Sequence, residues 1–187
     1  MKLMIMDVIE YTTSDGPGFR TSIYCSGCNH KCRECQNPQT WDIMHGHPVD
    51  VEDLFSKIRR NEMSNVTFSG GDPFYQPTAF TELAKMIKEK TDKTIWCYTG
   101  FTYEQIIKDA KMSKMLQYID VLVDGEFIVE LKDPDLLFRG SSNQRLIDVQ
   151  ASLKKGEVVL DSYNPYNLYE PQHEENKKIE KKELILI

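Results

Sequence analysis

The sequence predicts an α/β fold, an incomplete (β/α) barrel with a mostly parallel sheet. Short β-branched or aromatic runs alternate with helical patterns, the order typical of right-handed βαβ units. The 187 residues hold too few such runs for the eight repeats of a closed barrel. Composition is that of a globular domain, with 40% hydrophobic residues. We therefore expect one domain over residues 1–163, a barrel open along one side, and a polar tail over residues 164–187.

Apolar residues in the first half of the chain predict strands at residues 3–10, 19–24 and 65–69. Asp50 is a candidate N-cap for a helix over residues 51–61. The apolar residues of that helix recur at helical spacing: Val51, Leu54, Phe55 and Ile58.

The second half continues the alternation. Pro77 suits the first turn of another helix, and Thr102 with Gln105 forms a candidate capping box for a helix that runs toward Tyr118. Buried strands are predicted at residues 94–99 and 120–124, with weaker candidates at residues 144–149 and 157–161.

Glycine-rich and polar segments follow the ends of four predicted strands. They are a cysteine-rich loop, Gly70-Gly71-Asp72, Thr99-Gly100 and Asp124-Gly125. Because the carboxyl ends of parallel strands meet at one edge of a sheet, we expect all four segments on one rim, where ligands of such folds collect.

The cysteine loop holds four of the five cysteines of the chain, between residues 25 and 35. Soft thiolates crowded this closely favour a soft metal or a cluster. Cys28, Cys32 and Cys35 follow the pattern C-x3-C-x2-C, which can wrap one loop around a 4Fe-4S cluster and satisfy three of its irons. The fourth iron would stay open to a substrate or cosubstrate.

Other interpretations of these cysteines stay open. Two C-x2-C pairs could hold structural zinc, although only three residues separate the pairs. Cys25 could be a fourth cluster ligand, as in a ferredoxin, although the gaps differ from the ferredoxin order. Disulfides are disfavoured by the odd cysteine count. We interpret Cys97 as a buried core thiol and His30 as a loop residue, not a ligand.

The C-x3-C-x2-C loop resembles the signature of radical S-adenosylmethionine enzymes. More narrowly, residues 15–20 (DGPGFR) and residues 140–145 (GSSNQR) resemble activating enzymes of anaerobic, class III ribonucleotide reductases. The chain has Glu34 where many members of the superfamily carry an aromatic residue, and Asp72 where many have glutamate. The resemblance also implies an incomplete barrel of the radical S-adenosylmethionine type.

The resemblance implies a 4Fe-4S cluster on Cys28, Cys32 and Cys35 and S-adenosylmethionine as cosubstrate. Further residues are expected to bind this cosubstrate. The backbone of residues 34–36 would contact the adenine, and the glycine-rich motif at residues 70–72 would receive the methionine amino group. Asp124 would bind the ammonium or the ribose, and Asn143 and Arg145 would bind the methionine carboxylate. The expected cofactor-binding residues are Glu34, Cys35, Gln36, Ser69, Gly70, Gly71, Asp72, Asp124, Asn143 and Arg145.

The implied function is activation of anaerobic ribonucleotide reductase. One electron would cleave S-adenosylmethionine, and the resulting 5′-deoxyadenosyl radical would convert a glycine of the large reductase subunit to a glycyl radical. A low-potential donor such as a flavodoxin would supply the electron. The alternatives are an activase of another glycyl-radical enzyme, such as pyruvate formate-lyase, and, from a different class, a small electron-transfer iron–sulfur protein.

Charge and hydropathy limit the classes of partner that we expect for this protein. A formal charge of −6 gives no electrostatic reason to expect nucleic-acid binding. The apolar run at the N-terminus is too short for a signal peptide or a membrane helix. Clustered free thiols suit a reducing compartment, so we expect a cytoplasmic protein without a membrane partner.

Overall fold

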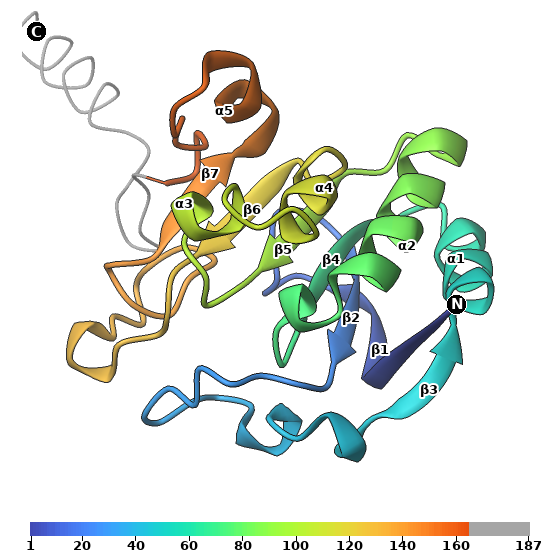
Figure 1. Ribbon diagram of the computed structural model, residues 1–187, viewed down its shortest axis with the longest axis horizontal. Helices are drawn as coiled ribbons and strands as arrows, with labels where there is room; N and C mark the ends of the chain where they lie inside the picture. Colours follow the sequence, from blue (N-terminus) through green and yellow to red (C-terminus); the bar gives the residue numbers. More distant parts are fainter. Residues whose placement is uncertain (165–187) are drawn as a thin grey trace, which may run out of the picture.

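The computed structural model describes residues 1–164, and these form one mixed sheet with helices packed against one face (Figure 1). The sheet has seven strands in the order β3-β1-β2-β4-β5-β6-β7. In chain order the strands are β1 (Lys2–Thr12), β2 (Arg20–Cys25), β3 (His47–Asp50), β4 (Asn65–Gly70), β5 (Ile95–Tyr98), β6 (Val121–Asp124) and β7 (Arg145–Asp148).

The middle of the sheet is parallel, as predicted, and its outer strands are not. β2, β4, β5 and β6 pair in parallel, whereas β1 pairs with β2 and β3, and β6 with β7, in antiparallel ladders. The seven residues between β1 and β2 are too few for a crossover, so that pair must be antiparallel. The described sheet is open, with β3 and β7 as its edges, and does not close into a barrel.

Three crossovers between the parallel strands carry the helices that cover the sheet. α1 and α2 pack side by side, and α2 packs against α4. The helices are α1 (Val51–Arg60), α2 (Pro77–Lys90), α3 (Tyr103–Ile106), α4 (Met112–Leu116) and α5 (Val149–Lys155), and short 3-10 turns are η1 (Pro38–Thr40), η2 (Ile43–His45), η3 (Pro73–Tyr75) and η4 (Val129–Leu131).

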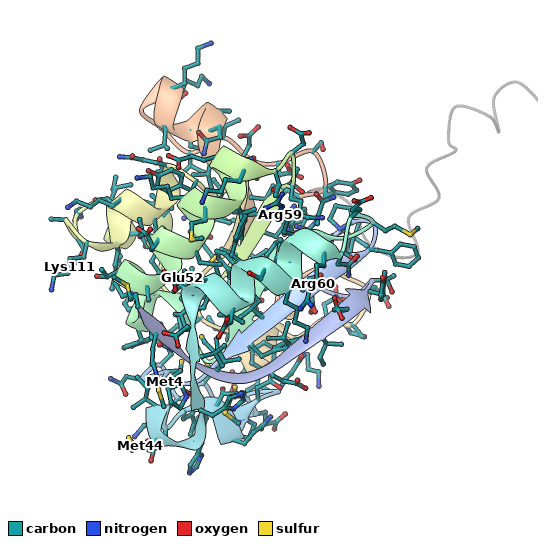
Figure 2. All side chains as sticks on the ribbon, turned by 90° about the vertical axis from the view of Figure 1, so that its right-hand side faces the viewer. Met4, Met44, Glu52, Arg59, Arg60 and Lys111 are labelled. Atoms are coloured by element: carbon teal, nitrogen blue, oxygen red, sulfur yellow. The ribbon has the colours of Figure 1, made fainter. Side chains whose placement is uncertain are left out.

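α1 has the predicted amphipathic pattern. Its apolar positions are buried, and Figure 2 shows Glu52, Arg59 and Arg60 on its outer surface. The acid lies in the first turn and the two arginines in the last, which suits the helix dipole. Asp50 precedes the helix as predicted, but its side chain makes no capping hydrogen bond.

Some predicted elements differ in the structure. The capping box of Thr102 and Gln105 is present, yet the helix ends at Ile106, because the Asp109 carboxylate accepts hydrogen bonds from the backbone of Lys111 and Met112 and starts a new turn before α4. Residues 157–161 form only an isolated bridge to β7, and residues 149–155 are helical.

Alternation along the strands divides the sheet into two faces. Ile23 and Cys25 of β2, like Cys97 of β5, lie in the core beneath the helices, and so do Val66 and Phe68 of β4. Tyr24 and Tyr98 point to the opposite face, which carries the large cavity described below. The core thiol predicted at Cys97 is confirmed.

Within residues 1–164 no helix has the length and apolar character needed to cross a membrane. The polar tail predicted for residues 164–187 lies outside the described residues except for Asn164.

Candidate functional site

The four predicted rim segments converge at the carboxyl ends of the parallel strands. The backbone N–H of Gly71 donates to Cys25 O at 2.7 Å, and that of Asp72 donates to Gly27 O at 2.9 Å. The Asp72 carboxylate accepts hydrogen bonds from the Thr99 hydroxyl and the Gly100 N–H. The cysteine loop therefore rests directly on the turns that follow β4 and β5.

Gly70 has a steric reason to be glycine. Its φ is +107°, and a Cβ at this position would lie 2.3 Å from Cys25 N. The backbones of β2 and β4 approach each other at their ends so closely that only a hydrogen atom fits between them.

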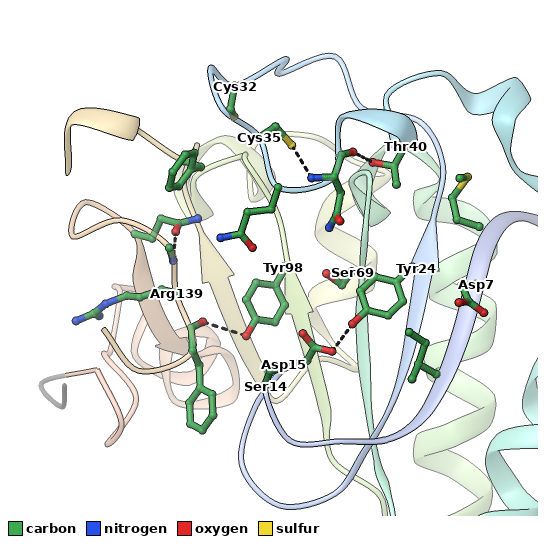
Figure 3. A pocket seen from close by; sticks show the side chains of 18 of the residues that line it. Asp7, Ser14, Asp15, Tyr24, Cys32, Cys35, Thr40, Ser69, Tyr98 and Arg139 are labelled. Atoms are coloured by element: carbon green, nitrogen blue, oxygen red, sulfur yellow. Dashed lines mark hydrogen bonds between the residues drawn. The ribbon is translucent and has the colours of Figure 1, made fainter. Parts of the chain in front are cut away.

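A cavity of about 1010 Å³ opens beneath the cysteine loop on the helix-free face (Figure 3). Four of the predicted site residues line it, namely Cys32, Cys35, Gln36 and Ser69. Cys28 instead lines a neighbouring hollow of about 600 Å³ on the other side of the loop. The loop thus forms the wall between the two spaces.

The three cysteines of the pattern are free and partly exposed. Lys31 and Glu34 have left-handed φ angles of 52° and 55°, which turn the chain between successive cysteines. The backbone N–H of Asn37 donates to Cys35 Sγ at 3.4 Å. Such donors stabilise a thiolate and tune a cluster that it binds.

Burial raises the pKa of Cys28 to about 11, although the backbone N–H groups of His30 and Lys31 act in the opposite direction. Burial likewise raises the pKa of Cys32. Positively charged iron would favour the thiolates, so cluster binding would release protons from these groups. Three free thiols from one tightly turned loop fit a cluster held by three cysteines.

Within residues 1–164 no three His, Cys, Asp or Glu side chains are arranged around a position for one metal ion. A 4Fe-4S cube presents a different iron to each cysteine, so its ligands need not converge on one point. Cys25 is fully buried in the core beneath the helices and faces away from the cavity. That placement disfavours Cys25 as a fourth ligand.

His30 is more than the loop residue predicted from the sequence. Its ring nitrogens lie 3.1 Å from an Asp72 oxygen and 3.0 Å from a Glu126 oxygen. Burial opposes the charged imidazolium, but the hydrogen bonds to these carboxylates outweigh it and raise the pKa of His30. The sequence held no signal for the contact, since the three residues are far apart along the chain.

Three predicted residues, Asp124 at the end of β6 and Asn143 and Arg145 near the start of β7, lie outside the lining of the large cavity. The Arg145 guanidinium contacts both Asp124 oxygens and also Glu104, with Nη2 2.8 Å from Glu104 Oε2. Hydrogen bonds from Arg145 lower the pKa of Glu104 to about 2. Asn143 donates to Glu126 O at 2.9 Å. These side chains thus bind one another and the adjacent loop.

The structure places further residues in the cavity that the predicted site did not include. Asp15 accepts hydrogen bonds from the hydroxyl groups of Ser22 and Tyr24, and Tyr98 donates to Phe138 O at 3.0 Å (Figure 3). Burial raises the pKa of both tyrosines. Polar residues at alternate positions of β2 were the available signal, since they predict a face that is not packed by helices. Leu136 and Leu137 add an apolar wall.

The close packing of Arg20 explains why the DGPGFR segment has a glycine at position 16. Its buried guanidinium donates to Thr67 Oγ1 at 2.6 Å and to Pro17 O at 3.3 Å, and it lies over the Trp96 ring. Burial lowers the pKa of Arg20 to about 10. A Cβ at Gly16 would lie 2.8 Å from Arg20 Cδ, so the loop that presents Asp15 folds closely over this arginine.

An open α/β sheet with a three-cysteine loop on its rim defines a class of iron–sulfur proteins. Residues 14–147 match the family model described as a 4Fe-4S single cluster domain. The anaerobic ribonucleoside-triphosphate reductase-activating protein of Vibrio cholerae is 41% identical over 138 residues, which cover 70% of this chain and 88% of the relative. Its namesakes in Pasteurella multocida (74% and 95% covered) and Enterobacteria phage T4 (71% and 85% covered) are each 36% identical. The chain belongs to the family of anaerobic ribonucleoside-triphosphate reductase-activating proteins.

Proposed function

We propose that this protein activates anaerobic ribonucleotide reductase by generating a glycyl radical on the reductase. The C-x3-C-x2-C loop on the rim carries this proposal, together with the family to which the chain belongs. The large reductase subunit is the macromolecular substrate. A low-potential carrier such as a flavodoxin supplies the electron, and the reducing cytoplasm is the compartment that suits three free thiols.

Cys28, Cys32 and Cys35 hold the 4Fe-4S cluster. When bound there, the cluster would supply the electron for reductive cleavage of S-adenosylmethionine, and so the radical chemistry needed to form the glycyl radical. The protein itself needs no nucleophile or general base for this reaction. Its residues position the reactants and exclude water.

The glycine turn and the cysteine loop form the cosubstrate site. Gln36 and Ser69 line the large cavity beside Cys35, and Glu34 exposes its backbone through its left-handed turn. Gly70 and Gly71 contribute backbone groups at the foot of the same loop. The Asp72 carboxylate is 1% exposed and already accepts four hydrogen bonds, so Asp72 acts by fixing this turn.

Asp124, Asn143 and Arg145 support the side of the proposed cosubstrate site that lies across from the cysteine loop. Arg145 joins Asp124 to Glu104, and Asn143 holds the backbone after β6. A contact between Arg145 and the methionine carboxylate requires Arg145 to exchange a carboxylate partner. In this proposal the open sheet serves as the incomplete barrel of a radical S-adenosylmethionine domain over residues 1–163.

The variant Cys28→Ala tests the cluster ligands. Because Cys28 lies outside the buried core, the variant should fold, yet it should produce no 5′-deoxyadenosine from S-adenosylmethionine with an artificial reductant. Far-UV circular dichroism checks the fold and chromatography measures the product. Wild-type yields from Cys28→Ala would contradict the ligand assignment.

The partner is tested by anaerobic activation assays with the reconstituted wild-type protein. The glycyl radical is expected on anaerobic ribonucleotide reductase by EPR, and not on pyruvate formate-lyase. Radical formation only on pyruvate formate-lyase would reassign the substrate. A reduced cluster whose EPR spectrum does not respond to S-adenosylmethionine would instead indicate an electron-transfer protein.

A further inference from the structure

The middle of the cysteine loop is tied to the rim through one side chain, His30. Its Nε2 lies 3.1 Å from Asp72 Oδ2, and its Nδ1 lies 3.0 Å from Glu126 Oε1. The His30 side chain is only 9% exposed, although the loop lies at the surface. A residue between Cys28 and Cys32 thus reaches the segments that follow β4 and β6.

The ring of His30 is also fixed by packing. It meets Phe101 edge to face with centroids 4.6 Å apart, and Tyr75 in the same manner at 5.8 Å. A Cβ at Gly100 would lie 2.5 Å from His30 Cδ2, so the glycine after β5 leaves the space that the ring fills. The orientation of the His30 ring is therefore fixed by its aromatic contacts, by the space at Gly100 and by the two carboxylates.

Asp72, the inner partner of His30, is itself rigidly held. Its Oδ1 accepts from Phe74 N at 2.9 Å, and its Oδ2 accepts from Thr99 Oγ1 at 2.9 Å and Gly100 N at 3.0 Å. These donors come from η3 and from the end of β5. His30 therefore binds an acceptor that cannot follow the loop if the loop moves.

We propose that His30 is a positioning residue, which holds the cysteine loop at a fixed place relative to Gly70 and Gly71. The inference rests on the proposed function, in which the cosubstrate spans from the cluster to the glycine turn. His30 binds neither iron nor cosubstrate. Its role is to set the separation that S-adenosylmethionine must bridge, and loss of this contact should weaken cosubstrate binding more than cluster binding.

The test uses reconstituted, reduced protein and titrates S-adenosylmethionine against the EPR spectrum of the cluster. His30→Phe keeps an aromatic ring but removes both nitrogens. Its iron and sulfide content should equal that of the wild type, while the dissociation constant of S-adenosylmethionine rises about tenfold or more, the size of one charge-assisted hydrogen bond. His30→Gln keeps a donor and should recover part of the affinity.

His47→Phe is the matched control, since His47 lies exposed on β3, an edge strand of the sheet. Its affinity should equal that of the wild type. The positioning role would be overturned if His30→Phe bound S-adenosylmethionine with wild-type affinity or lost its cluster. It would also be overturned if His30→Gln bound S-adenosylmethionine no better than His30→Phe. If His30→Phe does not fold, His30→Ala gives the same comparison without added bulk.

Hydrogen exchange in the metal-free proteins separates this proposal from the proposed function. Backbone amides of residues 28–35 should exchange about tenfold faster in His30→Phe than in the wild type, because the loop loses its tether. Equal exchange would overturn the tether. A wild-type cluster that ignores S-adenosylmethionine would refute the proposed function and leave the exchange result standing.

Discussion

Two successive cysteines of this chain, Cys25 and Cys28, have different roles because one ends a strand and the other lies in a loop. Cys25 is the last residue of β2 and its side chain is buried beneath the helices, whereas Cys28 lies in the loop that follows. Burial raises the pKa of the Cys25 thiol well above its usual value, so this group stays a neutral, small apolar residue. Sequence spacing placed Cys28 in the C-x3-C-x2-C pattern but left Cys25 open as a possible fourth ligand.

Cys25→Ala should therefore retain the cluster. We expect wild-type iron content and EPR response, with a loss of about 1 kcal/mol in the free energy of unfolding from the small cavity that replaces the thiol. Iron analysis and urea unfolding measure the two effects. Loss of one iron or of the cosubstrate response would mean that Cys25 is a ligand.

At the level of elements, Arg145 links β7 to α3. Its guanidinium contacts Glu104 in the first turn of α3 and Asp124 at the end of β6. The Glu104 side chain is 49% exposed, so solvent screening limits what its ion pair contributes.

Glu104→Gln should reveal this contribution through its pH dependence. Because the folded pKa of Glu104, about 2, lies below the usual 4.5, the ion pair stabilises the fold above pH 4.5 and this stability is lost as the pH falls toward 2. At pH 7 the variant should be less stable by roughly 0.5 kcal/mol, and the difference should shrink in acid. Urea unfolding of metal-free protein at several pH values measures it. A difference that stays constant or grows in acid would contradict the assignment.

For the whole molecule, the core and the cluster loop are largely separate. The main hydrophobic cluster lies between the sheet and its helices, and Cys28, Cys32 and Cys35 are not part of it. The fold therefore has its own source of stability, and the cluster adds to it by binding only the native arrangement of the loop.

Removal of iron by a chelator under anaerobic conditions should abolish visible absorption but leave the far-UV circular dichroism nearly unchanged. The metal-free protein should still unfold cooperatively, at a lower temperature than the loaded protein. Thermal melts of the two forms provide the comparison. A metal-free chain without a cooperative transition would show that the cluster is needed for folding.

The sequence by itself determined the alternation of strands and helices, the three-cysteine pattern and the set of rim segments. Each depends on local periodicity or spacing: the apolar positions of α1, the glycines after β4 and the residues between Cys28 and Cys35 are all readable along the chain. Only the tertiary structure decided that β3 and β7 are antiparallel edge strands, that Arg145 contacts Glu104 and that His30 reaches Asp72. The physical reason is that strand direction and side-chain partners depend on how distant segments pack, and local propensity does not encode which distant group fills a given space.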